Sequence, residues 1–472
     1  MSLTAKYEVL VVGSGPAGQK AAIMAAKAGK KVAVVEREQG LGGGCVYRGT
    51  IPSKTLRETA LSLDRIKRGA QAFDCQLKEG IEVGILMHRL TEVMEAHSQY
   101  ITAQLKRNHI TFLHGCCRFI SKHVLEMTTV DGQTQELQGD VIVLATGSRP
   151  KHPAFAPVDH EHVLDSDSIL SMIYLPKSLA ILGAGVIACE YASIFSLLGV
   201  EVTLIDLNPR PLRFMDPEIV ERFSTAFEAQ GGHYHGASRI ESIRWDGFSS
   251  VVTTLANGPI IKTEKMLVAL GRQPNMDDLD IAAAGLSSNE KGFIPVDQNN
   301  RTSVPHIYIV GDMAGPPSLA SAAMEQGRRA VSHALGTTVG SSDHFIPLGI
   351  YTIPEMASVG LDEAKARARF RNVFVGRATF EEVAKGQIAS AQNGLLKLIA
   401  GPDGRQILGV QIVGENATEL IHLAEMALVN GNPVDIFIES IFNFPTFAEA
   451  YRIAALDVVK QRNQAQPLAK AS

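Results

Sequence analysis

Residues 9–18 read VLVVGSGPAG, and this short segment indicates the architecture of the N-terminal region. An apolar run leads into a turn with three glycines, and an alanine-rich segment follows over residues 19–28. A second apolar run, Val32–Val35, then ends at Glu36. Strand, glycine turn, helix, strand and terminal acid in this order are typical of a βαβ unit that binds a dinucleotide.

Each part of this pattern has a physical task. The first glycine makes the tight turn, the second lets the backbone approach a pyrophosphate, and the third lets the helix pack closely on the strand. The phosphates lie at the N-terminus of the helix, and the acid accepts a hydrogen bond from a ribose hydroxyl. We therefore expect Gly13, Gly15, Gly18 and Glu36 to bind a dinucleotide.

The same layout occurs a second time in the chain. Leu179–Leu182 leads into the sequence GAGVIA at residues 183–188, a helical segment follows over Glu190–Leu198, and the strand Val202–Ile205 ends at Asp206. In both copies the acid lies 23 residues after the first glycine. Ala188 replaces the third glycine, which the pattern permits. The sequence thus predicts two dinucleotide units.

The remaining segments complete the predicted fold class. We expect a helix over Ile85–Leu105 and strands over Val141–Leu144, Met266–Leu270 and Ile307–Val310. From about Phe345 onwards, strands (Leu395–Ile399, Leu408–Val413) precede two helices (Glu415–Val429, Thr446–Lys460), without a glycine pattern. This predicts an α/β protein with two doubly wound Rossmann-like domains and a C-terminal α+β domain. The predicted domains are 1–150 with 276–344, 151–275 and 345–472.

Composition excludes several classes of function. The 472 residues carry a formal net charge of −4, and lysine and arginine are not gathered into a stripe, so we expect no nucleic-acid partner. The N-terminus lacks the features of a signal peptide, and the longest strongly apolar stretch, Leu179–Cys189, is too short to span a bilayer. Five cysteines do not form a secreted disulfide framework. We expect a cytoplasmic protein without membrane contact and without a metal site.

A third set of motifs points to a known family. The chain reads GGGC at residues 42–45, GTIPSK at 49–54, ATGSRP at 145–150, GRQPN at 271–275, VGD at 310–312 and PTFAEA at 445–450. These motifs resemble the flavoprotein disulfide reductases, the family of glutathione reductase and lipoamide dehydrogenase, over nearly the whole chain. The resemblance implies FAD at the first glycine turn, NAD or NADP at the second, and a homodimer or larger homo-oligomer formed by the C-terminal domain.

The resemblance also assigns the binding residues. Asp312 is implied to hold the ribityl chain of FAD. The residues implied to bind FAD are Gly13, Gly15, Pro16, Ala17, Gly18, Glu36, Gly44, Cys45, Lys54, Ala145, Thr146, Gly147, Arg272, Gly311, Asp312 and Ala320. The residues implied to bind NAD(P) are Gly183, Gly185, Val186, Ile187, Glu190, Asp206, Arg213 and Gly271.

Two departures from the family pattern bear on the reaction. The family's redox disulfide joins two cysteines separated by four residues, but here Thr50 stands where the partner of Cys45 belongs. Phe444 stands where the family has the histidine that serves as acid and base, five residues before Glu449. Thiol–disulfide chemistry needs a thiolate to attack a disulfide and a base to manage its proton. We therefore expect no disulfide reduction.

Within the family, this double loss resembles the transhydrogenases, which pass hydride between NADPH and NAD⁺ through the N5 atom of FAD in a ping-pong reaction. An FAD-dependent NAD(P)H:quinone or oxygen reductase, an atypical dihydrolipoamide dehydrogenase-like enzyme and a non-enzymatic FAD-binding protein are the alternatives. The candidate catalytic residues at family positions are Lys54, Glu190, Thr50, Cys45 and Glu449.

Three further expectations concern individual side chains. By resemblance, Lys54 and Glu190 pair beside the flavin on its nicotinamide side, whereas the alternative is a solvated surface lysine. Asp206 favours NAD because an acid repels a 2′-phosphate, while Arg213 aligns with an arginine of NADPH-using reductases. The alternative for Arg210 and Arg213 is that both are solvated loop charges.

A further expectation concerns packing. We expect core positions for Cys116 and Cys117, and core and interface packing for Phe442, Phe444 and Phe447.

Overall fold

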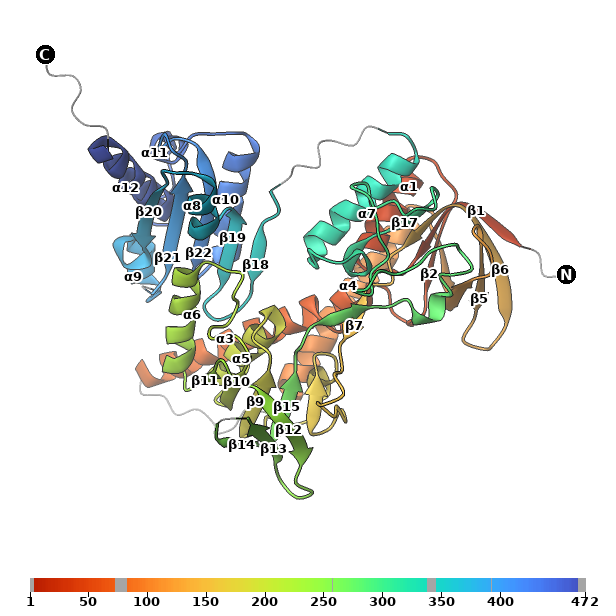
Figure 1. Cartoon of the computed structure of the whole chain (residues 1–472), viewed down its shortest axis with the longest axis horizontal. Helices are drawn as coiled ribbons and strands as arrows, with labels where there is room; N and C mark the ends of the chain where they lie inside the picture. Colours follow the sequence, from red (N-terminus) through yellow and green to blue (C-terminus); the bar gives the residue numbers. More distant parts are fainter. Residues whose placement is uncertain (1–3, 73–82, 257, 338–344, 392, 466–472) are drawn as a thin grey trace, which may run out of the picture.

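The computed structural model describes residues 4–72, 83–256, 258–337, 345–391 and 393–465. Three sheet-centred bodies can be followed in Figure 1, one around β1 and β6, one around β9 and β10, and one around β21 and β22. The first two have parallel central strands, which confirms the predicted α/β class. Among the described helices, none combines the length and the apolar character that crossing a bilayer requires.

The first sheet is built around the N-terminal strand. Its parallel strands run in the order β3-β2-β1-β6-β17, and β4 and β5 continue from β6 as an antiparallel meander. The strands are β1 (Ala5–Val12), β2 (Val32–Glu36), β3 (Thr111–His114), β4 (Cys116–Phe119), β5 (Val124–Thr128), β6 (Thr134–Leu144) and β17 (Ile307–Ile309). The helices of this part are α1 (Pro16–Lys27), α2 (Gly43–Tyr47), α3 (Thr50–Ala72), α4 (Val83–Arg107) and α7 (Ala320–Ala334).

The second sheet repeats the glycine-turn architecture. Its strands are all parallel, in the order β11-β10-β9-β15-β8. They are β8 (Val163–Asp165), β9 (Ser178–Leu182), β10 (Glu201–Ile205), β11 (His233–His235) and β15 (Lys265–Val268), with helices α5 (Val186–Leu197) and α6 (Pro217–Ala229). An antiparallel sheet of β12 (Ile240–Trp245), β13 (Val251–Leu255) and β14 (Ile260–Thr263) adjoins it. A ribbon of β7 (Ser148–Pro150) and β16 (Arg272–Pro274) pairs the ATGSRP and GRQPN motifs.

The third sheet is antiparallel, in the order β18-β19-β22-β21-β20. Helix α10 packs on β19 and β22, and α12 packs on β20 and β21. The elements are β18 (Leu348–Ile350), β19 (Met356–Gly360), β20 (Phe374–Thr379), β21 (Leu395–Ala400), β22 (Ile407–Val413), α8 (Glu363–Arg369), α9 (Ala384–Ile388), α10 (Ala417–Val429), α11 (Ile436–Glu439) and α12 (Glu449–Ala465).

Two expectations about packing are corrected by the structure. Phe447 is buried in the core of the third body, but Phe444 is 74% exposed because it lies in the irregular segment before α12, so it is not a core residue of this chain, and its expected interface packing stays a prediction. Cys117 is buried as expected, whereas Cys116 is exposed because successive side chains of a strand point to opposite faces.

Candidate functional site

A cavity of about 1330 Å³ is lined by residues from all three bodies. The two glycine turns, the start of α3, the N-terminus of α7 and the segment before β19 contribute to its wall. The predicted residues that line it are Gly13, Gly15, Pro16, Ala17, Glu36, Gly44, Cys45, Thr50, Lys54, Ala145, Thr146, Gly147, Gly185, Val186, Ile187, Glu190, Gly271, Arg272, Gly311, Asp312 and Ala320. The two sequence-distant nucleotide motifs therefore share one cavity.

The first glycine turn has the geometry that its sequence predicts. Gly13 has a φ of 103°, and a Cβ atom there would lie 2.3 Å from the carbonyl oxygen of Ala145. A Cβ atom on Gly18 would lie 2.0 Å from the carbonyl oxygen of Gly13, so this glycine packs behind the turn and does not line the cavity. Around Gly15, in contrast, a Cβ atom would meet no atom within 4 Å. This open side is where a ligand can approach the backbone.

The acids after β2 and β10 hold the two turns in the same way. Glu36 Oε2 accepts hydrogen bonds from the backbone N and the hydroxyl of Ser14, at 2.9 and 2.8 Å. Asp206 Oδ2 accepts from the backbone N of Ala184 at 2.9 Å. Each carboxylate keeps further lone pairs for other donors. The second acid does not line the cavity itself, since it lies at the outer end of β10.

The N-termini of α1 and α5 are suited to anions. Their N-cap residues, Gly15 and Gly185, provide no side-chain cap, and neither helix has an acid in its first turn. The first backbone N–H groups of a helix have no partner within it, and the helix dipole adds positive charge at this end. Both ends line the cavity and can receive phosphates.

Lys54 and Glu190 form an ion pair between α3 and α5. The Lys54 Nζ atom lies 2.6 Å from Glu190 Oε2, and the carboxylate is 6% exposed. Glu190 Oε1 accepts a hydrogen bond from the backbone N of Tyr351 at 2.9 Å. The Nζ atom also lies 4.8 Å from the centroid of the Tyr351 ring, within cation–π range. The predicted pair is therefore present, and the alternative of a solvated surface lysine is wrong.

Cys45 and Thr50 also meet at the wall of the cavity. Cys45 is a free, partly buried thiol in the structure. Burial raises the pKa of this thiol, and its hydrogen bond with Thr50 and the charge of Lys54 oppose the rise. A raised pKa keeps the sulfur protonated and weakly nucleophilic near neutral pH.

Asp312 is part of a polar chain that also includes Ser148 and Arg272. The Ser148 hydroxyl donates to Asp312 Oδ2 at 2.6 Å and accepts from Arg272 Nε at 2.8 Å. Arg272 Nη2 donates to the Ser148 backbone oxygen at 2.7 Å. The ribbon of β7 and β16 therefore places the carboxylate and the guanidinium side by side at the cavity wall.

Several predicted residues lie away from the cavity. Gly183 lies behind the second turn, where a Cβ atom would be 2.6 Å from the Ala269 oxygen. Arg213 is exposed. Arg210 is not a solvated charge, because its Nη2 atom donates to the backbone oxygens of Arg213 and Met215. Glu449 lies in the first turn of α12, and its buried Oε2 atom meets no hydrogen-bond partner in the part of the chain that the structure describes.

Sequence reasoning missed Tyr351, which contacts both members of the ion pair. It also missed the buried pair of Arg57 and Glu355, whose Nη2 and Oε1 atoms are 3.0 Å apart. The sequence around Tyr351 and around the Arg57–Glu355 pair does not indicate these contacts, because both form only where the third body packs against α3. Within the described residues, no group of three or more His, Cys, Asp and Glu side chains is arranged to hold a metal ion.

Comparison with known proteins agrees with this geometry. The family model of the pyridine nucleotide-disulphide oxidoreductases matches residues 7–327, and the model of their dimerisation domain matches residues 346–455. The chain is 41% identical over 458 residues to the soluble pyridine nucleotide transhydrogenase of Mycobacterium bovis strain BCG, covering 97% of this chain and 98% of that protein. It is 39% identical over 462 residues to the protein of the same name from Vibrio vulnificus strain YJ016, covering 96% and 97%.

Solved structures show the same fold over the whole length. LpdA from Mycobacterium tuberculosis superposes with a TM-score of 0.88 at 26% identity, covering 96% of this chain and 99% of that one. The HOCl-induced flavoprotein disulfide reductase RclA from Escherichia coli superposes with a TM-score of 0.86 at 25% identity, covering 95% and 99%.

Proposed function

Since this chain belongs to the pyridine nucleotide-disulphide oxidoreductase family, we propose that it is an FAD-dependent enzyme that transfers hydride reversibly between NADPH and NAD⁺. Relatives that share its full length at 39–41% identity are named soluble pyridine nucleotide transhydrogenases. The observation that carries the proposal is the contact of Cys45 with Thr50, a thiol beside a hydroxyl where a disulfide reductase needs a second thiol.

The residues present fit FAD. The cavity is large, Gly15 leaves the backbone open to a pyrophosphate, and the uncapped start of α1 offers N–H donors to it. Glu36 would accept a hydrogen bond from the adenosine ribose, and Asp312, which accepts from Ser148 beside Arg272, would hold the ribityl chain. When bound, FAD would supply the two-electron chemistry that links one nicotinamide to the other.

The second glycine turn is proposed to bind both nicotinamide substrates in alternation, which makes the reaction ping-pong. Gly185, Val186 and Ile187 line the cavity at the start of α5, and Glu190 follows one turn later. Asp206 would accept a hydrogen bond from the 2′-hydroxyl of NAD⁺, and Arg213 would attract the 2′-phosphate of NADPH. A site with a carboxylate and a guanidinium near the 2′-position of the ribose suits an enzyme that must accept both NAD⁺ and NADPH.

The ion pair of Lys54 and Glu190 would place a fixed positive charge beside the flavin and nicotinamide rings. Glu190 is held by the backbone N of Tyr351 and in turn holds the ammonium of Lys54. A fixed cation at this wall would stabilise an electron-rich bound ring and align the nicotinamide. The carboxylate of this pair is only 6% exposed, so its charge is compensated by Lys54 more than by solvent.

The segment before Glu449 is the second departure from the family's thiol chemistry. The buried Oε2 atom of Glu449 has no hydrogen-bond partner among the described residues. In the family pattern a histidine stands five residues earlier, but Phe444 occupies that position and offers no acceptor or donor in its side chain. Without that base and without a second thiol, Cys45 has no route to disulfide exchange.

The C-terminal domain is proposed to form a homodimer. The family model of the dimerisation domain matches it, and one side of α10 exposes Leu423, Met426 and Val429. Ile441 and Phe444 are also exposed, at 96% and 74%. Large exposed apolar side chains of this kind are typical of interfaces. The domain limits at residues 150, 275 and 344 and the cytoplasmic location stay predictions.

The decisive experiment combines a spectrum with two assays. The purified protein should show a flavin spectrum and should reduce thio-NAD⁺ with NADPH, without a disulfide or a quinone. Anaerobic dithionite titration should take about two electrons per FAD, because a disulfide reductase needs a further two for its cysteine pair.

Three results would contradict the proposal. Oxygen consumption that matches NADPH oxidation would favour an oxygen reductase. An uptake near four electrons would favour an atypical disulfide reductase. A flavin that NADPH does not bleach would favour a binding protein.

A further inference from the structure

The loop between β10 and α6 carries the two residues that are proposed to distinguish NAD(H) from NADP(H). It begins at Asp206 and ends at Asp216, the N-cap of α6. Its first part is tied to the glycine turn of its own domain, since Ala184 donates its backbone N–H to Asp206 and accepts one from Leu212 at 2.9 Å. Asp206 is therefore fixed within the nucleotide domain.

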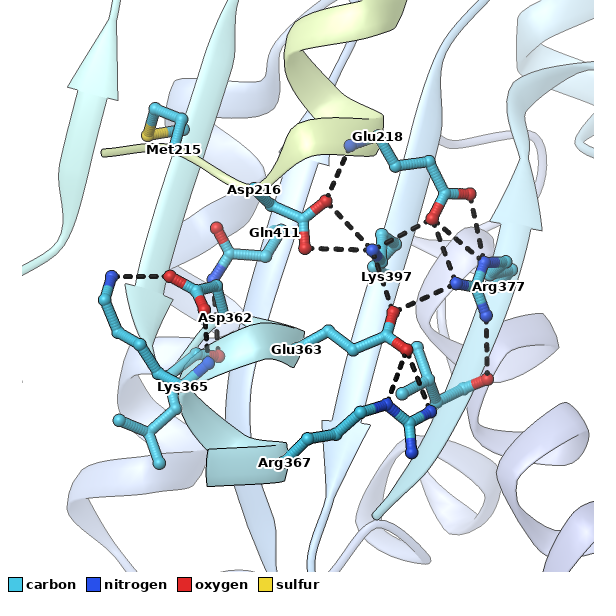
Figure 2. A network of polar contacts seen from close by, with 12 residues as sticks. Met215, Asp216, Glu218, Asp362, Glu363, Lys365, Arg367, Arg377, Lys397 and Gln411 are labelled. Carbon is cyan, nitrogen blue, oxygen red and sulfur yellow. Dashed lines mark hydrogen bonds and ion pairs between the residues drawn. The ribbon is translucent and has the colours of Figure 1, made fainter. Parts of the chain in front are cut away.

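The second part of the loop, residues 213–216, is tied to a different domain. Lys397 on β21 places its Nζ atom 2.9 Å from both carboxylate oxygens of Asp216. The lysine side chain is 3% exposed and the aspartate side chain 1% exposed. Figure 2 shows this pair where the N-terminus of α6 reaches the third sheet. The end of the loop next to Arg213 is thus held by the C-terminal domain.

Apolar packing does not explain why a lysine stands at position 397 in the middle of β21. The strand reads LLKLIA, and every residue in it is buried. A lysine in such a position stays charged only where carboxylates replace its hydration. Besides Asp216, Glu218 and Glu363 supply these carboxylates, at 2.9 and 3.1 Å.

The network around this lysine is continuous, and Arg367, which pairs with Glu363 at 2.8 Å, brings its cations to three against three carboxylates among the described residues. Arg377 on β20 binds both carboxylate oxygens of Glu218 and one oxygen of Glu363. The ion pairs with Arg377 and Lys397 lower the pKa of Glu218 to about 2 against the effect of burial. The carboxylates raise the pKa of Lys397, although burial alone would lower it. Glu218 and Lys397 are therefore charged together near neutral pH.

We propose that Lys397 is a positioning residue for recognition of the 2′-phosphate of NADP(H): it anchors Asp216, which fixes the loop segment that carries Arg213. This inference rests on the nucleotide site proposed above. Arg210 extends the anchor, because its Nη2 atom binds the backbone oxygens of Arg213 itself and of Met215. Asp206, tied to Ala184, does not depend on Lys397.

The test uses the FAD-loaded, full-length protein with the double substitution Lys397→Met and Asp216→Asn. This variant removes the ion pair without leaving one of its two charges unpaired, and Asn keeps an N-cap acceptor for α6. The probes are 2′,5′-ADP, which carries the 2′-phosphate, and ADP-ribose, which lacks it, each titrated by calorimetry. The matched control replaces another ion pair of the third domain, Arg462→Met with Asp435→Asn.

The double variant should bind 2′,5′-ADP about fivefold more weakly and ADP-ribose within about twofold of the parent, a coupling of the size seen for residues that act at a distance. The control variant should leave both affinities unchanged. If the double variant loses FAD, Asp216→Asn alone should shift the ratio in the same direction, since Lys397 then keeps Glu218 and Glu363.

An equal loss for both probes, or an unchanged ratio, would overturn the positioning role while the proposed function stands. A parent protein that binds neither probe would overturn the proposed nucleotide site and this inference with it.

Discussion

Glu190→Gln tests the ion pair at the centre of the cavity, because it keeps the shape of the side chain and removes its charge. The structure gives Glu190 two partners, the Lys54 ammonium at 2.6 Å and the backbone N of Tyr351 at 2.9 Å. A glutamine oxygen can still accept from Tyr351. The amide NH₂ group then faces the ammonium, so that two donors oppose each other.

The size of the effect follows from distance and burial. At 2.6 Å, with an effective dielectric constant of about 20, the gross attraction is about 6 kcal/mol. Lys54 is 25% exposed and regains part of its hydration when its partner is lost. Breaking a buried pair costs about 3–5 kcal/mol, and we expect the lower end, about 3 kcal/mol. If the whole chain unfolds as one unit, this lowers Tm by about 3 °C, and by more for a smaller unit.

The assay is a double-mutant cycle on the FAD-loaded protein. Glu190→Gln and Lys54→Met should each lower Tm, and the double variant should recover more than half of the loss, because it leaves no unpaired charge. Glu126→Gln is the control: its partner Arg118 is 57% exposed, and such surface pairs contribute about 0–1 kcal/mol. A Tm of Glu190→Gln equal to that of the control, or no recovery in the double variant, refutes the reasoning.

Four further outcomes are expected. Asp206→Ala should weaken NAD(H) relative to NADP(H), and Arg213→Ala should do the opposite; an unchanged KM for NADPH at low salt in Arg213→Ala would return this residue to the solvated surface. Cys45→Ser should keep kcat within about tenfold, or about 1.4 kcal/mol of barrier, at unchanged FAD content. Since burial raises the pKa of Cys45, its alkylation by iodoacetamide, followed at this residue by peptide mass spectrometry because Cys116 is also exposed, should accelerate only above the usual thiol range near pH 8.5, and fast reaction of Cys45 at pH 7 would contradict this. Because the pKa of Glu218 is lowered to about 2 in the folded protein, its stabilising effect is present above its unfolded value of about 4.3 and is lost as pH falls towards 2. The Tm difference between the parent and Glu218→Gln should therefore shrink below about pH 4.3, and a difference that does not change with pH would count against it.

The parts of the fold that depend on local geometry were predictable from the sequence. Gly13 needs a left-handed backbone and close contact with Ala145, so only glycine fits, and the pattern is visible in the residue letters. The limits of the elements were less certain: α12 begins at Glu449 instead of Thr446 and continues to Ala465. The sheet of β12–β14 was not predicted, since its strands are short and mostly polar on one face.

The candidate site was predictable where one motif supplies the whole arrangement, and not where distant segments meet. Cys45 lies in α2 and Thr50 begins α3 five residues later, so one short motif supplies both sides of their contact. Tyr351 contacts Glu190 only because the third sheet packs against α3, and no local sequence pattern predicts this packing. Lys397 is recognisable in the sequence as a charged residue in the middle of the apolar strand LLKLIA. Its partners Asp216 and Glu218 could not be predicted, because they lie far away in the sequence.

The C-terminal domain forms hydrogen bonds with two charged side chains of the nucleotide domain, Glu190 in the proposed site and Asp216 at the N-terminus of α6. The backbone N of Tyr351 fixes the carboxylate of Glu190 at the nicotinamide end of α5. Lys397 fixes Asp216 next to the loop at the adenosine end. A sheet that makes both contacts constrains the separation of Glu190 and Asp216, and the contact between Lys397 and Asp216 is fully buried. If both nicotinamide nucleotides bind at this site as proposed, the domain that the family model describes as a dimerisation domain also helps to set the geometry of their binding.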